Sequence, residues 1–183
     1  MFNSLFDGAP VDIMQMLDAR ERRAHTQQQL LEQLNPCVLV SITLNIPGPV
    51  KNSEAITTVF ASVISELDEA LLPFECLHQE DFSLPTGMEF YRVLRADALS
   101  VKRACTEFEE GHSLGRLLDI DVVEMAGETP TPISRTALGM APRRCFICNE
   151  EAKVCARSRK HSIPEMQEHI ARMIAAYTSI QRP

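Results

Sequence analysis

The feature that most constrains the fold is a ten-residue apolar run, CVLVSITLNI at residues 37–46, which ends at Pro47-Gly48-Pro49. The run is rich in β-branched residues and is long enough for a buried strand. Because two prolines cannot donate hydrogen bonds to a sheet, the strand must end where they begin. The sequence therefore predicts a buried strand followed by a rigid turn.

Helices and further strands are expected on both sides of this strand. They are a helix at 11–34, a helix at 52–72, strands at 74–82 and 88–95, a helix at 96–110, a strand at 117–125, a proline-interrupted loop at 129–142 and a helix at about 164–180. From residue 37 the order is β-α-β-β-α-β, which predicts an α+β sandwich with flanking helices. A ferredoxin-like, split βαβ sheet is one form of it, and a nucleotidyltransferase-like sheet is the alternative.

The chain has 183 residues, so we expect one domain over 1–183, with its α/β core at about 37–128 and a Cys/Arg-rich segment at 142–161. Helical spacing predicts which side chains face inward. The expected apolar positions are Ile13, Met14, Leu17 and Ala24 in the first helix, Ile56, Val59, Phe60, Val63, Ile64 and Leu67 in the second, and Leu99, Ala104 and Phe108 in the third. The charged middle of the first helix, residues 18–23, is expected to face water, and Ser53 is the expected N-cap of the second.

Asp119 and Asp121 are candidates for chemistry, because residues two apart on a strand project from the same face. Neighbouring carboxylates repel unless a cation lies between them, and Mg²⁺ prefers oxygen ligands that it shares with substrate phosphates. Arg116 is close by, and Gly111 and Gly115 permit close approach of the backbone to a ligand, a set typical of phosphoryl or nucleotidyl transfer. The alternative is a solvent-facing strand with two unrelated charges.

A second candidate is the series Cys145, Cys148, Cys155 and His161, with the spacing C-x2-C-x6-C-x5-H. Three thiolates and an imidazole can supply four zinc ligands. Unmetallated packing thiols are the alternative, since the gap before the third cysteine is shorter than in common zinc modules. A thioredoxin-like role lacks its βαβ context.

Charge is distributed unevenly along the chain. Residues 142–161 hold six basic and two acidic residues, a local charge of +4 within a chain of net charge −7. The net charge argues against a surface that coats nucleic acid or an anionic membrane. The basic segment suits an anion clamp, because arginine binds phosphate through two parallel hydrogen bonds, although a solvated face is the alternative reading.

Two further residues are candidates by position. Lys51 follows Pro47-Gly48-Pro49 at the expected start of a helix, where backbone amides and the lysine can receive a phosphate, although a simple strand-to-helix turn is the alternative. His112, beside the aspartate strand, is either a general base or a cap of the preceding helix.

The sequence has no run of 18 apolar residues and no secretory signal at its start, so we expect neither a membrane span nor export. Six cysteines without a secretory signal indicate reduced thiols or metal ligands, and hence the cytoplasm.

Three stretches of the chain together resemble one enzyme family. They are NIPGPVKNS at residues 45–53, GRLLDIDV at 115–122, and residues 142–161, which begin with PRRCFIC and end with VCARSRKH. The family is that of the apo-citrate lyase phosphoribosyl-dephospho-CoA transferases, and the resemblance extends over roughly residues 12–175.

The resemblance implies transfer of the prosthetic group of 2'-(5''-triphosphoribosyl)-3'-dephospho-CoA to a serine of the citrate lyase acyl carrier protein (gamma chain), with release of diphosphate. The enzyme would be a nucleotidyltransferase that uses Mg²⁺, with neither a nucleic acid nor a membrane as partner. The assignments that follow are Asp119 and Asp121 to Mg²⁺, Arg116, Arg143 and Arg144 to the charge on the phosphates, Lys51 to a terminal phosphate, Arg157 and Arg159 to the nucleotide end of the donor, and Asp121 or His112 to the base.

Two rival functions remain open on the sequence. One is a related nucleotidyltransferase that acts on another donor or carrier. The other is a non-catalytic, zinc-stabilised module in which the acidic strand and the basic segment form a protein-docking surface.

Overall fold

The computed structural model describes residues 5–148 and 150–180. Its helices and strands follow one another in nearly the predicted order. They are α2 (Ile13–Gln33), β1 (Val38–Leu44), α3 (Glu54–Leu71), β2 (Glu75–Leu84), β3 (Gly87–Arg95), α4 (Ala98–Gly111), β4 (Leu118–Ala126), β5 (Thr129–Pro132), α5 (Ala152–Ser158) and α6 (Ile163–Ile180), with short 3-10 helices at Gly115–Leu117 and Arg135–Leu138.

The strands form one five-stranded antiparallel sheet in the order β2-β3-β1-β4-β5. β1 and β2 are both antiparallel to β3, so they run parallel to each other, with α3 as the crossover between them and β3 inserted in the middle. This is the split βαβ arrangement. The predicted α+β class is confirmed, and the sheet has the ferredoxin-like order.

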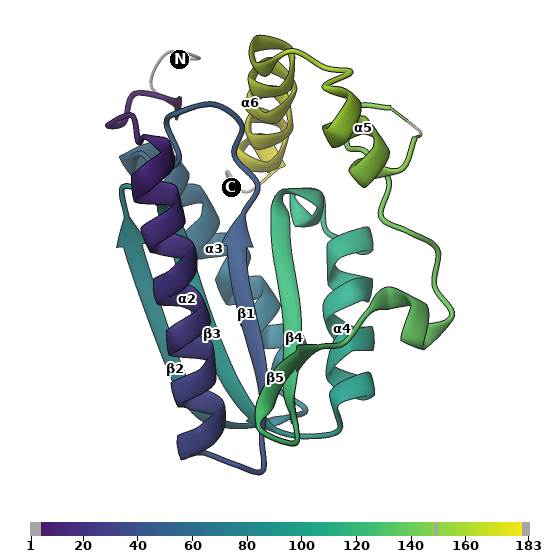
Figure 1. Ribbon diagram of the computed structural model, residues 1–183. Coiled ribbons are helices and arrows are strands. Elements are labelled where there is room, and N and C mark those ends of the chain that lie inside the picture. Colours follow the sequence, from purple (N-terminus) through teal and green to yellow (C-terminus); the bar gives the residue numbers. More distant parts are fainter. Residues whose placement is uncertain (1–4, 149, 181–183) are drawn as a thin grey trace.

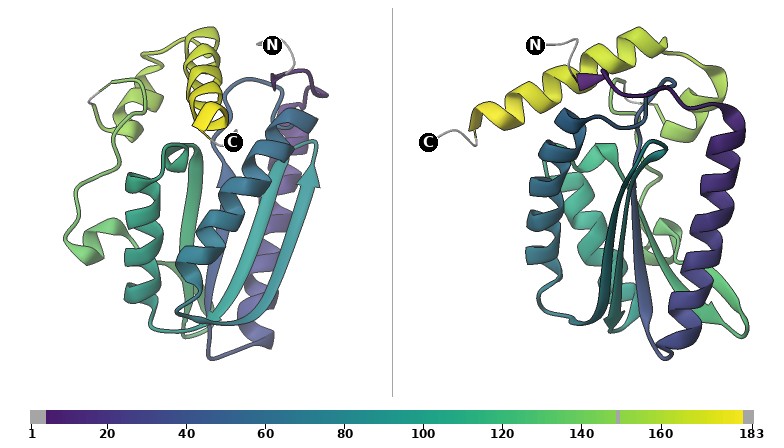
Figure 2. Two further views of the ribbon diagram at one scale, coloured as in Figure 1. Left: turned by 180° about the vertical axis from the view of Figure 1, so that it is seen from behind. Right: turned by 90° about the vertical axis from the view of Figure 1, so that its left-hand side faces the viewer.

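The sheet lies between two layers of helices. α2 covers one face, α3 and α4 cover the other, and α6 crosses one end of the sandwich (Figures 1 and 2). α5 and the segment that leads to it lie beyond the β4 side of the sheet (Figure 1). No helix in the described parts of the chain is both long and apolar enough to cross a lipid bilayer.

The second predicted helix is confirmed as α3. Ser53 caps it by accepting the amide hydrogen of Ile56 at 3.1 Å. Its buried side chains recur at helical spacing and include five of the six predicted ones, with Val59 partly buried beside them. This helix packs as the sequence predicts because one apolar stripe meets one apolar face.

Alternation along the strands gives each face of the sheet its own partners. Val40 and Ile42 of β1 belong to the main core with α3, α4 and α6, whereas Leu39 packs in a smaller cluster with Leu30 and Leu31 of α2. Because side chains alternate between faces, the even-numbered residues of β1 face the main core and the odd-numbered ones face α2.

β4 follows the same rule, as predicted. Leu118 and Ile120 are buried in the main core, and Val123 packs in the α2 cluster. Asp119 and Asp121 share the parity of Val123, so they project from the α2 face of the sheet. The fold thus presents both aspartates on one surface.

The first and third helices turn partly different faces inward from those predicted. Ile13, Met14 and Leu17 near the start of α2 are exposed, and Leu99 in α4 is 45% exposed. The inward residues of α4 are instead Ala98, Val101, Lys102, Cys105, Thr106 and Glu109. Apolar spacing misled here because both helices turn charged residues toward the sheet, where buried partners neutralise them.

Glu89 is the buried partner of α2. Its carboxylate is 3% exposed, receives hydrogen bonds from Arg22 at 2.8 Å and Arg23 at 3.1 Å, and accepts another from the hydroxyl of Tyr91. The prediction that the charged middle of this helix faces water is therefore wrong for Arg23, whose side chain is 20% exposed, whereas Arg22 remains 46% exposed.

Two short elements were not predicted. β5 lies in the expected loop and pairs with β4 from Val123 to Ala126, although two of its four residues are prolines. An edge strand tolerates proline, because one side of its backbone needs no donor. α5, of seven residues, forms inside the cysteine-rich segment.

Candidate functional site

The outer edge of β4 is paired with β5 only in its second half, and other groups bind the carbonyls of its first half. The amide of Ile133 donates to the carbonyl of Val122 at 2.7 Å, the Lys102 ammonium donates to that of Ile120 at 3.0 Å, and Arg143 donates to that of Leu118. Two cations are thereby fixed beside the strand that carries the aspartates.

A recess of about 550 Å³ opens at this edge, between β4, α4 and the segment that follows β5. Its walls combine both signs of charge. The charged residues that line it are Lys102, Arg135, Arg143, Lys153, Glu109, Asp119, Asp121 and Glu151. Both predicted aspartates therefore open into one cavity, together with the predicted Arg143.

The ionised carboxylate of Asp121 is disfavoured in this recess. Partial loss of hydration raises the pKa of its carboxyl, and the charge of Asp119 raises it further, against a smaller opposing effect of Lys102. Asp119 itself is bound by Arg143 at 3.1 Å. A cation between the two carboxylates would relieve their repulsion.

A cluster of arginines surrounds Glu109, which is buried at the end of α4. The Glu109 carboxylate lies 2.5 Å from Arg135 and 3.5 Å from Arg143. Burial lowers the pKa of Arg116, and the charges of Arg143 and Arg135 lower it further. The Arg143 guanidinium also donates to the carbonyl of Arg116 at 3.4 Å. The Nε of Arg116 is buried and has no hydrogen-bond partner among the described residues.

Lys51 lies in a separate, smaller hollow at the end of β1. Its ammonium donates to the carbonyl of Ile46 at 2.7 Å, and burial lowers its pKa. The hollow, of about 110 Å³, is also lined by Arg23 and Thr43. Thr43 is the cross-strand neighbour of Asp119, so this hollow adjoins the aspartates along the α2 face of the sheet.

His112 lies on the other side of the sheet. Its ring stacks on Phe108, its Nδ1 accepts the amide hydrogen of Leu114, and its Nε2 is 3.2 Å from Glu66 of α3. These contacts belong to the layer of α3 and α4, whereas the aspartates project from the α2 face. The structure does not bring His112 together with the aspartates.

Of the other basic residues of this segment, Lys153 also lines the recess, whereas the predicted site residues Arg144, Arg157 and Arg159 do not. Arg144 is exposed, and its backbone bridges to Glu151, while Arg157 and Arg159 are exposed at the end of α5. Of the cations predicted from residues 142–161, the structure brings Arg143 to the aspartates.

Sequence reasoning missed five charged residues that line the recess, namely Lys102, Glu109, Arg135, Glu151 and Lys153. A signal for two of them is present, because Lys102, Thr106 and Glu109 recur at helical spacing on the buried face of α4. Such a polar stripe among apolar neighbours indicates buried partners. Arg135 lies in the expected loop, and no pattern distinguishes it.

Gly115 has a packing role that the sequence did not indicate. A Cβ at this position would lie 2.7 Å from the carbonyl oxygens of Phe108 and Glu109, so helix backbone, not a ligand, occupies the adjoining space. The glycine lets the turn before β4 pass close to the end of α4, and this brings Arg116 next to Glu109.

We therefore expect Gly115→Ala to destabilise the fold by about 1–3 kcal/mol, because the backbone it meets cannot move without disturbing α4. Urea unfolding followed by circular dichroism measures the change. Gly111→Ala is the control, since a Cβ there meets nothing within 4 Å and alanine favours helix. Equal stability of the two variants would contradict the packing role.

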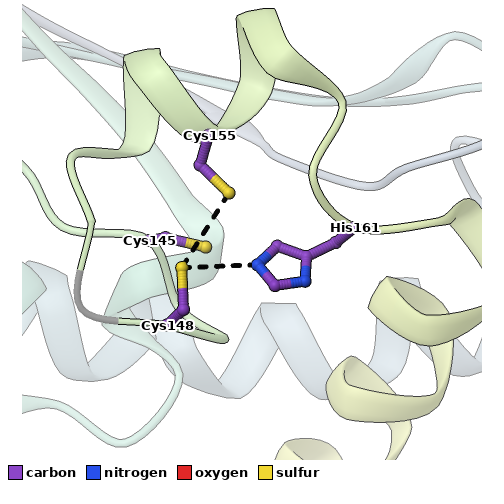
Figure 3. Close-up of side chains that lie close together, drawn as sticks. All are labelled: Cys145, Cys148, Cys155 and His161. Atoms are coloured by element: carbon purple, nitrogen blue, oxygen red, sulfur yellow. Dashed lines mark hydrogen bonds between the residues drawn. The ribbon is translucent and has the colours of Figure 1, made fainter.

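The cysteine and histidine side chains of the Cys/Arg-rich segment converge, as Figure 3 shows. The ligand atoms of Cys145, Cys148, Cys155 and His161 all lie within 4.8 Å of one another. In the part of the chain that the structure describes, no other group of three or more Cys, His, Asp or Glu side chains is placed so that it could hold a metal ion. The predicted cluster therefore exists in space and has the composition of a metal site.

Comparison with known proteins identifies the family. The sequence profile of one family, described as apo-citrate lyase phosphoribosyl-dephospho-CoA transferase, matches residues 11–177. The chain belongs to this family.

Curated relatives bear the same description. A probable apo-citrate lyase phosphoribosyl-dephospho-CoA transferase of Streptococcus pyogenes serotype M18 is 39% identical over 175 residues, which cover 96% of this chain and 91% of that protein. The enzyme of that description from Shigella boydii serotype 18 is 35% identical over 85% of this chain and 84% of its own length. Protein CitXG of Leuconostoc mesenteroides subsp. cremoris is 36% identical over 91% of this chain, but over only 36% of its own length. The chain is thus a member of a family of transferases that act on apo-citrate lyase.

Proposed function

We propose that this chain transfers the prosthetic group of 2'-(5''-triphosphoribosyl)-3'-dephospho-CoA to a serine hydroxyl of the acyl carrier (gamma) subunit of apo-citrate lyase. The serine oxygen forms a phosphodiester with the α-phosphate, and diphosphate leaves, which makes the enzyme a nucleotidyltransferase. The observation that carries the proposal is the recess at the β4 edge. In this recess the chain, which belongs to the transferase family, has two carboxylates surrounded by cations.

The aspartate pair fits a magnesium site of the kind that phosphate substrates complete. Asp119 and Asp121 share one face and one cavity, where burial and then the charge of Asp119 raise the pKa of Asp121. Two carboxylates suffice, because Mg²⁺ usually takes its other ligands from water and substrate phosphates. Bound there, Mg²⁺ would neutralise charge on the triphosphate and on the departing diphosphate.

Arg143 is the residue that would change partners when the donor binds. It is now hydrogen-bonded to Asp119. A triphosphate that arrives with its cation offers a phosphate to Arg143 and a positive charge to Asp119, so both groups exchange one ionic partner for another.

The neighbouring cations extend the phosphate-binding surface. Arg116 does not line the recess and its Nε is buried without a partner among the described residues, so it would contribute to phosphate binding through its positive charge. Lys51 would hold a terminal phosphate in the adjoining hollow. Arg144, Arg157 and Arg159 are exposed and would serve the nucleotide end of the donor or the carrier. Electrostatic stabilisation by such groups is the main source of catalysis in phosphoryl transfer.

The serine proton needs an acceptor close to the α-phosphate. Asp121 is favoured over His112, because Asp121 opens into the recess whereas His112 is engaged by Glu66 on the other side of the sheet.

The cysteines are free thiols, which accords with the cytoplasm as the place of this reaction. A metal in the Cys/His cluster would take no direct part in the chemistry, since four protein ligands leave no open position for a substrate.

The direct test is the mass of the acceptor. Apo-carrier incubated with this protein, the triphosphoribosyl donor and Mg²⁺ is expected to gain the mass of the phosphoribosyl-dephospho-CoA group, with one diphosphate released per carrier. Carrier in which the acceptor serine is replaced by alanine is the control and should keep its mass. An unchanged mass of the intact carrier, with donor and Mg²⁺ both present, would refute the proposal.

A further inference from the structure

The Cys/His cluster is assembled from three separate pieces of chain (Figure 3). Cys145 and Cys148 lie in the loop before α5, Cys155 lies within α5, and His161 lies in the link to α6. The sulfurs of Cys148 and Cys155 are 4.0 Å apart, and Nε2 of His161 is 3.4 Å from the sulfur of Cys148. A disulfide requires about 2.05 Å between sulfurs, so these are separate thiols that share a centre.

The spacing of these atoms is that of ligands around a small ion. Zinc bonds of about 2.3 Å to sulfur and 2.0–2.1 Å to nitrogen place tetrahedral neighbours roughly 3.5–3.8 Å apart. The separations of Cys148 from Cys155 and from His161, 4.0 and 3.4 Å, bracket this range. The ligand types also favour zinc over Mg²⁺. Soft thiolates and imidazole in a tetrahedral array suit zinc, whereas Mg²⁺ requires oxygen ligands.

The groups behind the ligands point to the same conclusion independently. Nδ1 of His161 lies 3.0 Å from the carboxylate of Glu165, so the ring has its other nitrogen directed at the sulfurs. A carboxylate that holds a histidine in this way is the usual support of a zinc ligand. The amide of Ile147 donates to the sulfur of Cys145 at 3.4 Å, a bond that stabilises a thiolate.

The segment around the cluster has too little apolar surface to hold its own shape. Among the described residues of 142–161, only Cys155 is buried, and α5 has only seven residues. Short units of this kind fold when a metal crosslinks them, since the binding energy of the ion becomes folding energy.

The cluster is coupled to the candidate active site through the chain itself. The amide of Cys145 donates to the carbonyl of Glu150, and the amide of Ala152 donates to that of Arg143, each at 2.8 Å. These two bonds close a small loop that has Arg143 at its base and the cluster at its tip. Arg143 in turn binds β4 and Asp119.

We infer that Cys145, Cys148, Cys155 and His161 bind one structural zinc ion, which orders residues 142–161 and thereby positions Arg143 beside the aspartates. The zinc site stands on its own geometry. Only its consequence for catalysis rests on the proposed function.

Metal content tests the site itself. Purified full-length protein is expected to hold about one equivalent of zinc by elemental mass spectrometry, and Co²⁺ in its place should give the absorption of a tetrahedral cobalt–thiolate centre. Cys148→Ser and His161→Ala should each lose most of the metal. Cys76→Ser, which removes an exposed thiol outside the cluster, should keep it. Protein that neither contains nor takes up zinc, or a Cys148→Ser variant with full zinc content, would overturn the inference.

Limited trypsin digestion tests the ordering of the segment, which contains six basic residues. Removal of zinc with a chelator is expected to speed cleavage within 142–161 at least tenfold, while circular dichroism of the sheet and helices stays unchanged and added zinc restores resistance. Unchanged cleavage would refute the positioning role. Neither measurement depends on transfer of the prosthetic group, so both can give the expected result even if the proposed function is wrong.

Discussion

Asp121→Asn is expected to reduce the rate of prosthetic-group transfer about a thousandfold, without weakening the fold. A metal that neutralises charge on a transferring phosphate is worth several kcal/mol, and about 4 kcal/mol corresponds to a factor of a thousand. Asparagine keeps the shape of the side chain but removes both the charge that binds the cation and the proposed base. The rate is measured by the mass shift of the carrier over time.

The stability of the same variant separates a functional role from a structural one. In the folded state the pKa of Asp121 is raised, so the folded protein binds this proton more readily than the unfolded chain does. Stability contributed by the group is therefore lost as pH rises through the folded pKa, and at neutral pH the ionised carboxylate disfavours folding. We expect Asp121→Asn, in the absence of divalent cations, to unfold at the same temperature as the wild type or a higher one.

Two matched variants complete the experiment. Asp119→Asn is expected to lose activity as well, because it removes the other carboxylate of the pair. Glu128→Gln, in the exposed turn between β4 and β5, removes one negative charge from the same hairpin outside the recess and should retain activity. Near-normal transfer rates in both aspartate variants would rule out the magnesium assignment.

What could be predicted from the sequence was local. The run at 37–46 predicted β1 because β-branched residues and two prolines act on the backbone within a few positions, and the stripe of α3 predicted its buried face for the same reason. The alternation of β4 placed Asp119 and Asp121 on one surface. The spacing of the Cys/His series gave the composition of a cluster that the structure then brings together.

What could not be predicted depends on partners that are distant in sequence. Arg23 faces inward only because Glu89, more than sixty positions away, is buried opposite it. β5 is a strand only because the edge of β4 is free to pair with it. Arg143 reaches Asp119 across 24 positions, whereas Arg144, next to it and identical in type, is exposed. Residue type alone does not distinguish such neighbours.

The charge of the chain shows the same limit. A net charge of −7 argues against polyanion partners, yet the recess gathers Lys102, Arg135 and Arg143 around the aspartates. These three cations meet there because the fold draws them from α4, from the segment after β5 and from the base of the Cys/His loop. Local charge at a site is a property of the fold, and the sum over the chain does not report it.

Glu109→Gln is expected to lower the free energy of unfolding by about 3 kcal/mol, the largest stability effect that we anticipate for a single charge. Glu109 is 3% exposed, and it is the buried anion between Arg135 and Arg143, with Arg116 close by. Removal of the buried carboxylate leaves the charges of the arginines around it without compensation. The resulting loss of stability exceeds the net stability that the ion pairs contribute. Urea unfolding provides the measurement.

Glu110→Gln is the matched control for this prediction. Glu110 is the next residue, and its exposed carboxylate binds the same Arg135 at 2.6 Å. Because exposed ion pairs contribute little, this variant should lose less than about 1 kcal/mol. If the two variants unfold at the same urea concentration, burial of Glu109 does not govern the arginine cluster. If only Glu109→Gln is destabilised and also loses transfer activity in conditions where it remains folded, Glu109 is the residue that holds the phosphate-binding arginines in place.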